Sequence, residues 1–132
     1  MCQITKGETY GYSVERWEKA KLEAIRAIVR EAKEYGLPIS YSDLAQRVTG
    51  ICFDPHDRVF HFMLGQISEE EDAAGRGMLS VLVVHKGGDG MPGAGFWDLA
   101  KQMGKDTRNK IDFWVRETQE VMKKCKTHPM LA

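Results

Sequence analysis

The stretch from residue 75 to residue 97, GRGMLSVLVVHKGGDGMPGAGFW, most constrains the fold of this chain. Its run MLSVLVV, from Met78 to Val84, is apolar except for Ser80 and rich in β-branched residues, which predicts a buried strand. The segment GGDGMPGAG that follows has five glycines and one proline in nine residues, which predicts a tight reversal of the backbone. Apolar residues return at Phe96 and Trp97. We therefore expect one strand and one glycine-rich loop, set between helices.

A long amphipathic helix is predicted over residues 13–35. Ser13 can cap its start, and apolar residues recur every three or four positions along it. Gly36 favours the left-handed conformation that ends a helix, and Pro38 prevents its continuation. We expect this helix to have no function beyond packing.

Two shorter helices are predicted before the strand. Ser40 or Ser42 is expected to cap the first. The pair Asp54-Pro55 predicts the start of the second, because aspartate caps helices and proline is favoured at the first helical position. Ser68, followed by Glu71 three residues later, has capping-box spacing and predicts that a fresh turn begins there.

Two more helices are predicted after the loop. The first contains Phe96 and is closed by Gly104. Asp106 or Thr107 is expected to cap the last helix, over about 106–124. Its apolar stripe is expected to comprise Ile111, Trp114, Val115, Thr118, Val121 and Met122.

The order of these elements predicts a mainly α fold with a small β element. At 132 residues we expect a single domain, 1–132, with a core over about 37–104 flanked by the long helices 13–35 and 106–124. The residues expected to share the core are Leu44, Phe60, Leu64, Val81, Leu82, Val83, Val84 and Trp114.

Composition limits the environment of the chain. No apolar run approaches the roughly 18 to 20 residues that a membrane span needs, and the first residues lack the features of a secretory signal. The cysteines Cys2, Cys52 and Cys125 are odd in number and have no CxxC spacing, which argues against disulfides and a thiolate zinc site. We expect a cytoplasmic protein with reduced thiols; the oligomeric state is left open.

Charge is balanced overall but unevenly distributed. The chain has 19 basic and 19 acidic residues. Residues 53–72 have six acidic residues and one basic residue, a local charge of −5, whereas residues 101–126 have eight basic and four acidic residues, a local charge of +4. A polarised molecule is therefore expected.

The chemically reactive side chains predict no catalytic, metal or cofactor site. His56 and His61 are five residues apart and diverge on a helix, so a metal site that includes them is not favoured. Cys52 near His56 lacks an accompanying oxyanion-hole motif. The loop GGDGMPGAG is neither a P-loop nor a dinucleotide-binding fingerprint.

Two short helices followed by a strand and a glycine-rich reversal resemble the winged helix-turn-helix of DNA-binding proteins. Within that class, ISYSDLA at residues 39–45 resembles the motif that opens the helix-turn-helix of alkylguanine-DNA alkyltransferases and alkyltransferase-like proteins. The resemblance implies that Tyr41 contacts a DNA phosphate and that Arg58, in DRV, fills the gap left by a flipped base. LVVHK at residues 82–86 corresponds to the family's apolar strand, which ends in His and Arg.

The chain departs from that family where the reaction takes place. Val84 stands at the position of the reactive cysteine, and Val83 replaces the preceding proline. The segment between Ala45 and Arg58 is also longer than in the family. Alkyl transfer to this chain is therefore not expected.

Two functions remain as hypotheses. The first is a non-enzymatic winged-helix protein that binds double-stranded DNA and recognises its structure or damage, which the order of elements favours. Its expected DNA-binding residues are Tyr41, Arg47, Arg58, His85, Lys86 and Lys101. The second is a protein-interaction module that binds a protein partner through the acidic edge from Ser68 to Asp72, which the zero net charge favours.

Overall fold

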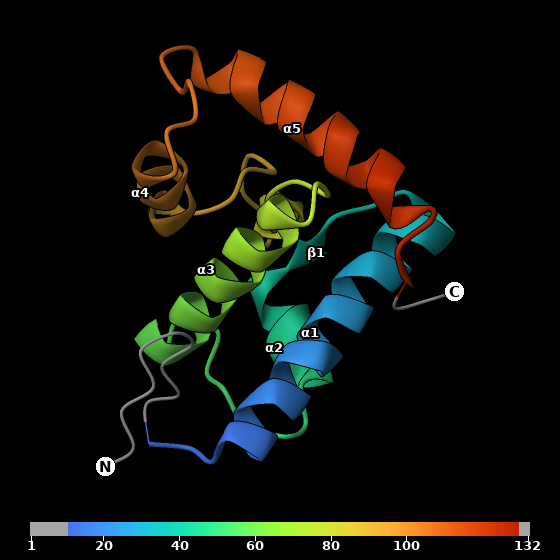
Figure 1. Ribbon diagram of the computed structural model, residues 1–132, viewed down its shortest axis with the longest axis vertical. Coiled ribbons are helices and arrows are strands. Elements are labelled where there is room, and N and C mark those ends of the chain that lie inside the picture. Colours follow the sequence, from blue (N-terminus) through green and yellow to red (C-terminus); the bar gives the residue numbers. More distant parts are fainter. Residues whose placement is uncertain (1–10, 130–132) are drawn as a thin grey trace.

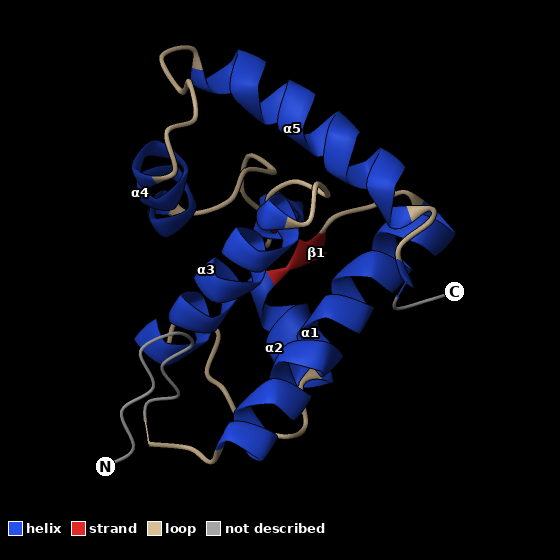
Figure 2. Cartoon of the chain, viewed as in Figure 1, coloured by secondary structure: helices blue, strands red, loops and turns tan. Residues whose placement is uncertain are grey.

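Five α-helices and two short strands form the fold of residues 11–129, the part of the chain that this computed structural model describes. The elements are α1 (Val14–Tyr35), β1 (Ile39–Ser40), α2 (Tyr41–Arg47), α3 (Arg58–Ala73), the 3₁₀ helix η1 (Leu79–Leu82), β2 (Val83–Val84), α4 (Ala94–Gln102) and α5 (Lys110–Cys125). Helices dominate, as Figure 2 shows. The prediction of a mainly α fold with a small β element is confirmed.

The helices surround η1 and the small sheet. In Figure 1, β1 lies between α1 and α3, and α5 lies across the top of the view. α5 contacts both α1 and η1, and α4 packs against α3. The segment containing η1 contacts α1, α3, α5 and β2, which places it at the centre of the structure.

The buried residues form one apolar cluster. The predicted core residues Leu44, Phe60, Leu64 and Val81–Val84 all belong to the buried set, none more than 8% exposed. Trp17 is also fully buried, and its indole N–H donates to Gln66 Oε1 at 2.8 Å, which satisfies its polar group. Trp114 is less buried than predicted: its side chain is only partly buried and packs against the edge of the cluster.

The predicted strand from Met78 to Val84 is mostly a 3₁₀ helix. Only Val83 and Val84 pair with β1, in parallel and in register with Ile39 and Ser40. A two-residue partner strand leaves the preceding backbone to find other hydrogen bonds. The N–H of Ser80 donates to Ser68 Oγ at 2.9 Å, on the buried face of α3.

The ends of α1 and the start of α2 are as predicted. Ser13 accepts a hydrogen bond from the N–H of Arg16, and Gly36 ends the helix with φ of +64°. Ser40, the first of the two candidates, caps α2 by accepting from the N–H of Asp43 at 3.1 Å.

Two predicted starts within the region of α3 are wrong. Asp54 does not begin the helix, because it forms a separate turn in which its carboxylate accepts from the N–H of His56; α3 starts at Arg58, with Asp57 at the cap position. Ser68 starts no fresh turn either, because its buried hydroxyl bonds Ser80 and α3 continues to Ala73.

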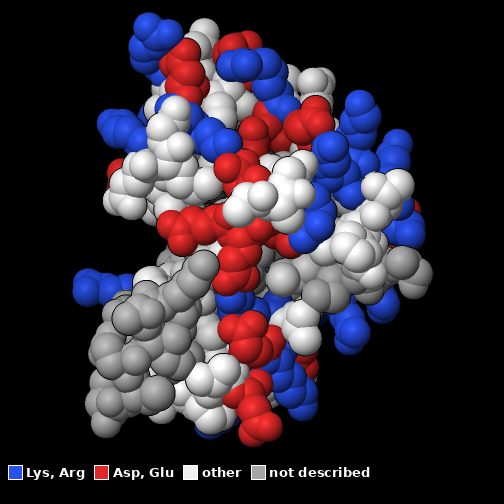
Figure 3. Space-filling view, in the orientation of Figure 1, with Lys and Arg blue, Asp and Glu red and all other residues white. Residues whose placement is uncertain are grey.

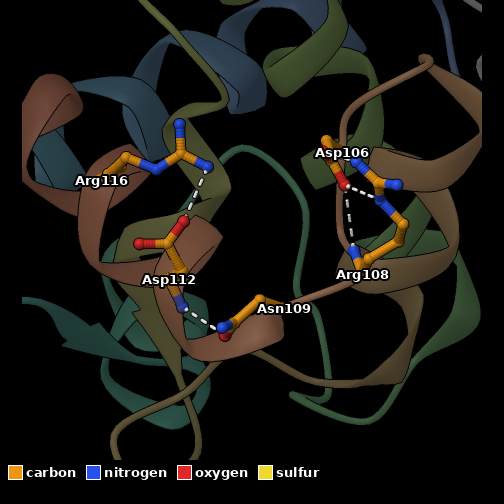
Figure 4. Close-up of polar contacts among 5 residues, drawn as sticks. All are labelled: Asp106, Arg108, Asn109, Asp112 and Arg116. Carbon is orange, nitrogen blue, oxygen red and sulfur yellow. Dashed lines mark hydrogen bonds and ion pairs between the residues drawn. The ribbon is translucent and has the colours of Figure 1, made fainter.

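The last helix starts later than predicted. Asn109 caps α5 by accepting from the N–H of Asp112 at 3.0 Å, whereas the carboxylate of Asp106 binds the Arg108 side chain (Figure 4). Arg108 also lowers the pKa of Asp106 to about 2. The cap is therefore neither Asp106 nor Thr107. The buried face of α5 also differs from the predicted stripe, because Phe113 is buried while Ile111 and Val115 are exposed.

Candidate nucleic-acid interface

The glycine-rich loop folds back onto the first residue of α2. The backbone N–H of Gly93 donates a hydrogen bond to Tyr41 Oη at 2.9 Å, across 52 residues of sequence. The ring of His85, which follows β2, lies 5.1 Å from the Tyr41 ring between centroids. Tyr41 also stacks on the ring of His61 in α3, with the two ring centroids 4.9 Å apart. We call Tyr41, His61, His85 and Gly93 the tyrosine cluster.

Local structure holds each member of the tyrosine cluster. Tyr41 directly follows the Ser40 cap, so the start of α2 sets its position. His61 Nε2 lies 2.9 Å from the carbonyl oxygen of Pro55, and since a carbonyl can only accept, Nε2 carries the proton. A side chain at position 93 would place its Cβ 3.0 Å from His85 Nε2, so the His85 ring would have to move by a few tenths of an ångström to admit it.

Tyr41 is a buried phenol at the centre of the cluster. The residue is only 8% exposed, and this burial raises the pKa of its hydroxyl. It therefore stays neutral at physiological pH. Its oxygen serves as the acceptor that holds the loop, a role that the sequence did not indicate; its contact with a DNA phosphate stays a prediction.

Removing the Tyr41 hydroxyl tests this attachment. We expect Tyr41→Phe to destabilise the fold by about 1 kcal/mol, since the Gly93 N–H loses its acceptor, and to speed hydrogen exchange of the Gly93 amide. Tyr35→Phe, at a residue 65% exposed, is the matched control and should change neither quantity. Unchanged exchange at Gly93 in Tyr41→Phe would show that the hydroxyl does not hold the loop.

Two exposed cations lie beside the tyrosine cluster. Lys86 follows His85 directly, and its side chain is 71% exposed, with Nζ 4.0 Å from Asp43 on the first turn of α2. Arg58 begins α3 three residues before His61, so both lie on one face of the helix. Arg58 is exposed and forms no ion pair within residues 11–129.

The other two predicted DNA-binding residues lie apart from the cluster. Arg47, at the opposite end of α2 from Tyr41, forms an ion pair with Glu31 of α1 at 3.1 Å. Lys101 is exposed on the last turn of α4. The structure thus brings Tyr41, His85 and Lys86 together, and not Arg47 or Lys101.

A hollow lies along the outer side of α2. Its volume is about 450 Å³, and it extends from α2 to the segment that leads into α3. Its lining combines apolar side chains with small polar ones: Ser42, Ala45, Gln46, Val48, Thr49, Cys52, Phe53 and Pro55. Ser42 and Gln46 contribute polar side chains from α2 to this lining, whereas the Thr49 hydroxyl bonds Glu23 of α1.

The sequence prediction missed His61 and Gly93. From the sequence alone, His61 is considered only as a metal ligand. Its three-residue spacing from Arg58 is the signal that could have placed both residues on one face of the helix. Nothing local marks Gly93, because its partner Tyr41 is distant in sequence. Within residues 11–129, no three His, Cys, Asp or Glu side chains are grouped as a metal site requires.

The predicted acidic edge is largely neutralised. Three of its four carboxylates form ion pairs, and Ser68 is buried. The ion pairs are Glu70–Lys21 at 2.8 Å, Glu71–Arg76 at 2.9 Å and Asp72–Lys105 at 2.9 Å. On the face in Figure 3, acidic side chains form a band down the middle with Lys and Arg on both sides. On this face the two signs of charge lie side by side.

Comparisons with known proteins leave the family undetermined. Within residues 11–129, none of the helices combines the length and apolar character that crossing a membrane requires. The sequence matches no family model, and neither a curated protein nor a solved structure is significantly similar to the chain.

Proposed function

We propose that this chain binds duplex DNA without catalysing a reaction, through a face made of α2, the start of α3 and the glycine-rich loop of residues 85–93. In this proposal α2 and α3 act as the helix pair of a winged helix-turn-helix, and the loop acts as the wing. The observation that most supports this proposal is the hydrogen bond from the Gly93 N–H to Tyr41 Oη, which fixes the loop beside the first turn of α2. This bond adds to the pairing of β2 with β1 and to the contact of His85 with Tyr41, so the loop and the helix pair form one surface.

The exposed cations on this face are few, so we expect a small footprint on DNA. Lys86 is exposed and available to a phosphate, and Arg58 is exposed at the start of α3. The zero net charge means that these few local contacts must supply the electrostatic attraction. We therefore expect weak binding at physiological salt and clear binding only at low salt.

The proposed binding is non-covalent. Val84, at the position of the alkyltransferase family's reactive cysteine, is an apolar side chain only 8% exposed. The other hypothesis, a protein partner on the acidic edge, has less support, because ion pairs already occupy three of the four carboxylates there. Only Glu69 on that edge is exposed without an ion pair in the described part of the chain.

Titration of labelled duplex DNA at several salt concentrations tests the proposal. Binding should weaken as salt rises, and Lys86→Ala should reduce the slope of log affinity against log salt by about 0.9. Lys123→Ala, which removes an exposed cation from α5, is the matched control and should leave the slope unchanged. Absence of binding at low salt would refute the proposal.

Arg58 should behave differently from Lys86. A side chain that reaches into the base stack acts on substrate preference more than on salt dependence. Arg58→Ala should therefore weaken binding to mismatched or damaged duplex more than binding to intact duplex. An equal loss for both duplexes would make Arg58 an ordinary phosphate contact.

A further inference from the structure

A second cationic surface lies between α1 and the end of α2. It is a cavity of about 310 Å³. Its lining is Glu23, Arg26, Ala27, Arg30 and Arg47, so three of the five residues are arginines. The cavity lies at the opposite end of α2 from the tyrosine cluster, and none of its lining residues belongs to that cluster.

Helix geometry brings the three guanidinium groups to one cavity. Arg26 and Arg30 are four residues apart and therefore lie on the same face of α1. Between them is Ala27, whose short side chain leaves space between the arginines. Arg47 comes from the last turn of α2, and its ion pair with Glu31 of α1 holds it toward the cavity.

The one carboxylate in the lining is already occupied. Glu23 Oε1 accepts from the backbone N–H groups of Thr49, at 2.9 Å, and Gly50, at 2.7 Å. Its other oxygen accepts from the Thr49 hydroxyl. Partial burial acts to raise the pKa of Glu23, but these hydrogen bonds outweigh it and lower the pKa. Glu23 thus serves to attach the segment after α2 to α1, and it leaves the arginines for other partners.

The arginines have most of their donors available. Arg26 forms no ion pair within residues 11–129. Arg30 has only a long contact, 3.8 Å from Nε to Glu34, between two exposed side chains. Since each guanidinium has five N–H donors and exposed ion pairs are weak, an incoming anion can compete for these groups.

We propose that this arginine cavity, lined by Arg26, Arg30 and Arg47, binds a phosphate group. Planar guanidinium groups bind phosphate in a bidentate manner, and the several oxygens of a phosphate can accept from more than one arginine at once. The phosphate belongs either to a small phosphate compound or to the backbone of a nucleic acid that extends past α2. This site is additional to the proposed DNA face.

Titration with inorganic phosphate and with pyrophosphate, against sodium chloride at equal ionic strength, tests the first source. Phosphate or pyrophosphate should raise the melting temperature of the unmodified protein, and Arg26→Ala should weaken the affinity about tenfold or more. Glu34→Gln, which frees Arg30 from its one carboxylate contact among residues 11–129, should strengthen the affinity. Lys123→Ala on α5 is the control and should leave it unchanged.

Duplex DNA titrations of the same variants test the second source. If the phosphate belongs to DNA, Arg26→Ala should reduce the salt slope by about 0.9 relative to Lys123→Ala, even where free phosphate has no effect. If DNA does not bind the unmodified protein, the proposed function fails and the titrations with free phosphate alone decide the cavity. Arg26→Ala behaving like Lys123→Ala in every titration would overturn the phosphate site.

Discussion

Replacing Leu82 with Asp is expected to unfold the protein. Leu82 is 1% exposed at the end of η1, the segment that contacts α1, α3, α5 and β2. Burying an unpaired carboxylate there costs several kcal/mol, which is comparable to the total stability of about 5 to 15 kcal/mol of an ordinary domain. Thermal unfolding followed by circular dichroism should show no cooperative transition for Leu82→Asp.

Leu22→Asp provides the matched control for this substitution. Leu22 is 41% exposed on α1, so the same chemical change there meets solvent. Its melting temperature should remain close to that of the unmodified protein, since surface substitutions usually change stability by less than about 0.5 kcal/mol. If Leu82→Asp instead unfolded cooperatively at an unshifted temperature, the assignment of η1 to the core would be wrong.

Removing the carboxylate of Glu71 is expected to have the second largest effect. Both oxygens of Glu71 accept from the Arg76 guanidinium at 2.9 Å, and Oε1 also lies 2.7 Å from Nε2 of His128. Glu71 and His128 are 5% and 3% exposed, so this carboxylate joins α3 to the segment after α5 inside the fold. Taking one partner from a fully buried ion pair typically costs about 3 to 5 kcal/mol, and since the Arg76 side chain is 29% exposed we expect the lower end of that range.

Denaturant unfolding of Glu71→Ala measures that cost. Glu69→Ala is the matched control, because Glu69 is a neighbouring glutamate that is exposed. We expect the control to lie within about 0.5 kcal/mol of the unmodified protein. Equal midpoints for the two variants would show that the Glu71 cluster adds no stability.

The same carboxylate predicts how stability depends on pH. Burial acts to raise the pKa of Glu71, but the hydrogen bonds from Arg76 and His128 outweigh it, so the pKa lies below its ordinary value of 4.5. The charged form is therefore stabilised by folding. Its contribution is complete above about pH 4.5 and is lost as the pH falls through the pKa of the folded state. Between pH 5 and pH 3, Glu71→Gln should lose less stability than the unmodified protein.

Short-range signals explain which parts of the fold the sequence predicted. Ser13, Gly36 and Ser40 act through hydrogen bonds or backbone angles within four residues of their own position. Such interactions operate whatever the rest of the chain does. The same holds for burial of Phe60 and Leu64, which follows from apolar spacing along a helix.

Where the local signals failed, a distant partner had overridden them. Ser68 has capping-box spacing, but its hydroxyl instead bonds Ser80 in the core, and α3 runs through it. The run before Val83 has strand-forming residues, but β1 provides only two residues to pair with. A strand needs a neighbour for its hydrogen bonds, and the length of that neighbour cannot be read from the strand itself.

The sequence by itself determined the helical class, the long α1 with its two ends, the start of α2 and the apolar core around residues 81–84. Only the tertiary structure decided that Tyr41 holds Gly93, that Glu71 binds His128, and that Arg47 joins the arginines of α1 instead of Tyr41. The physical reason is range: capping and periodicity are local, whereas these side-chain contacts need chain segments that only the packed fold brings together.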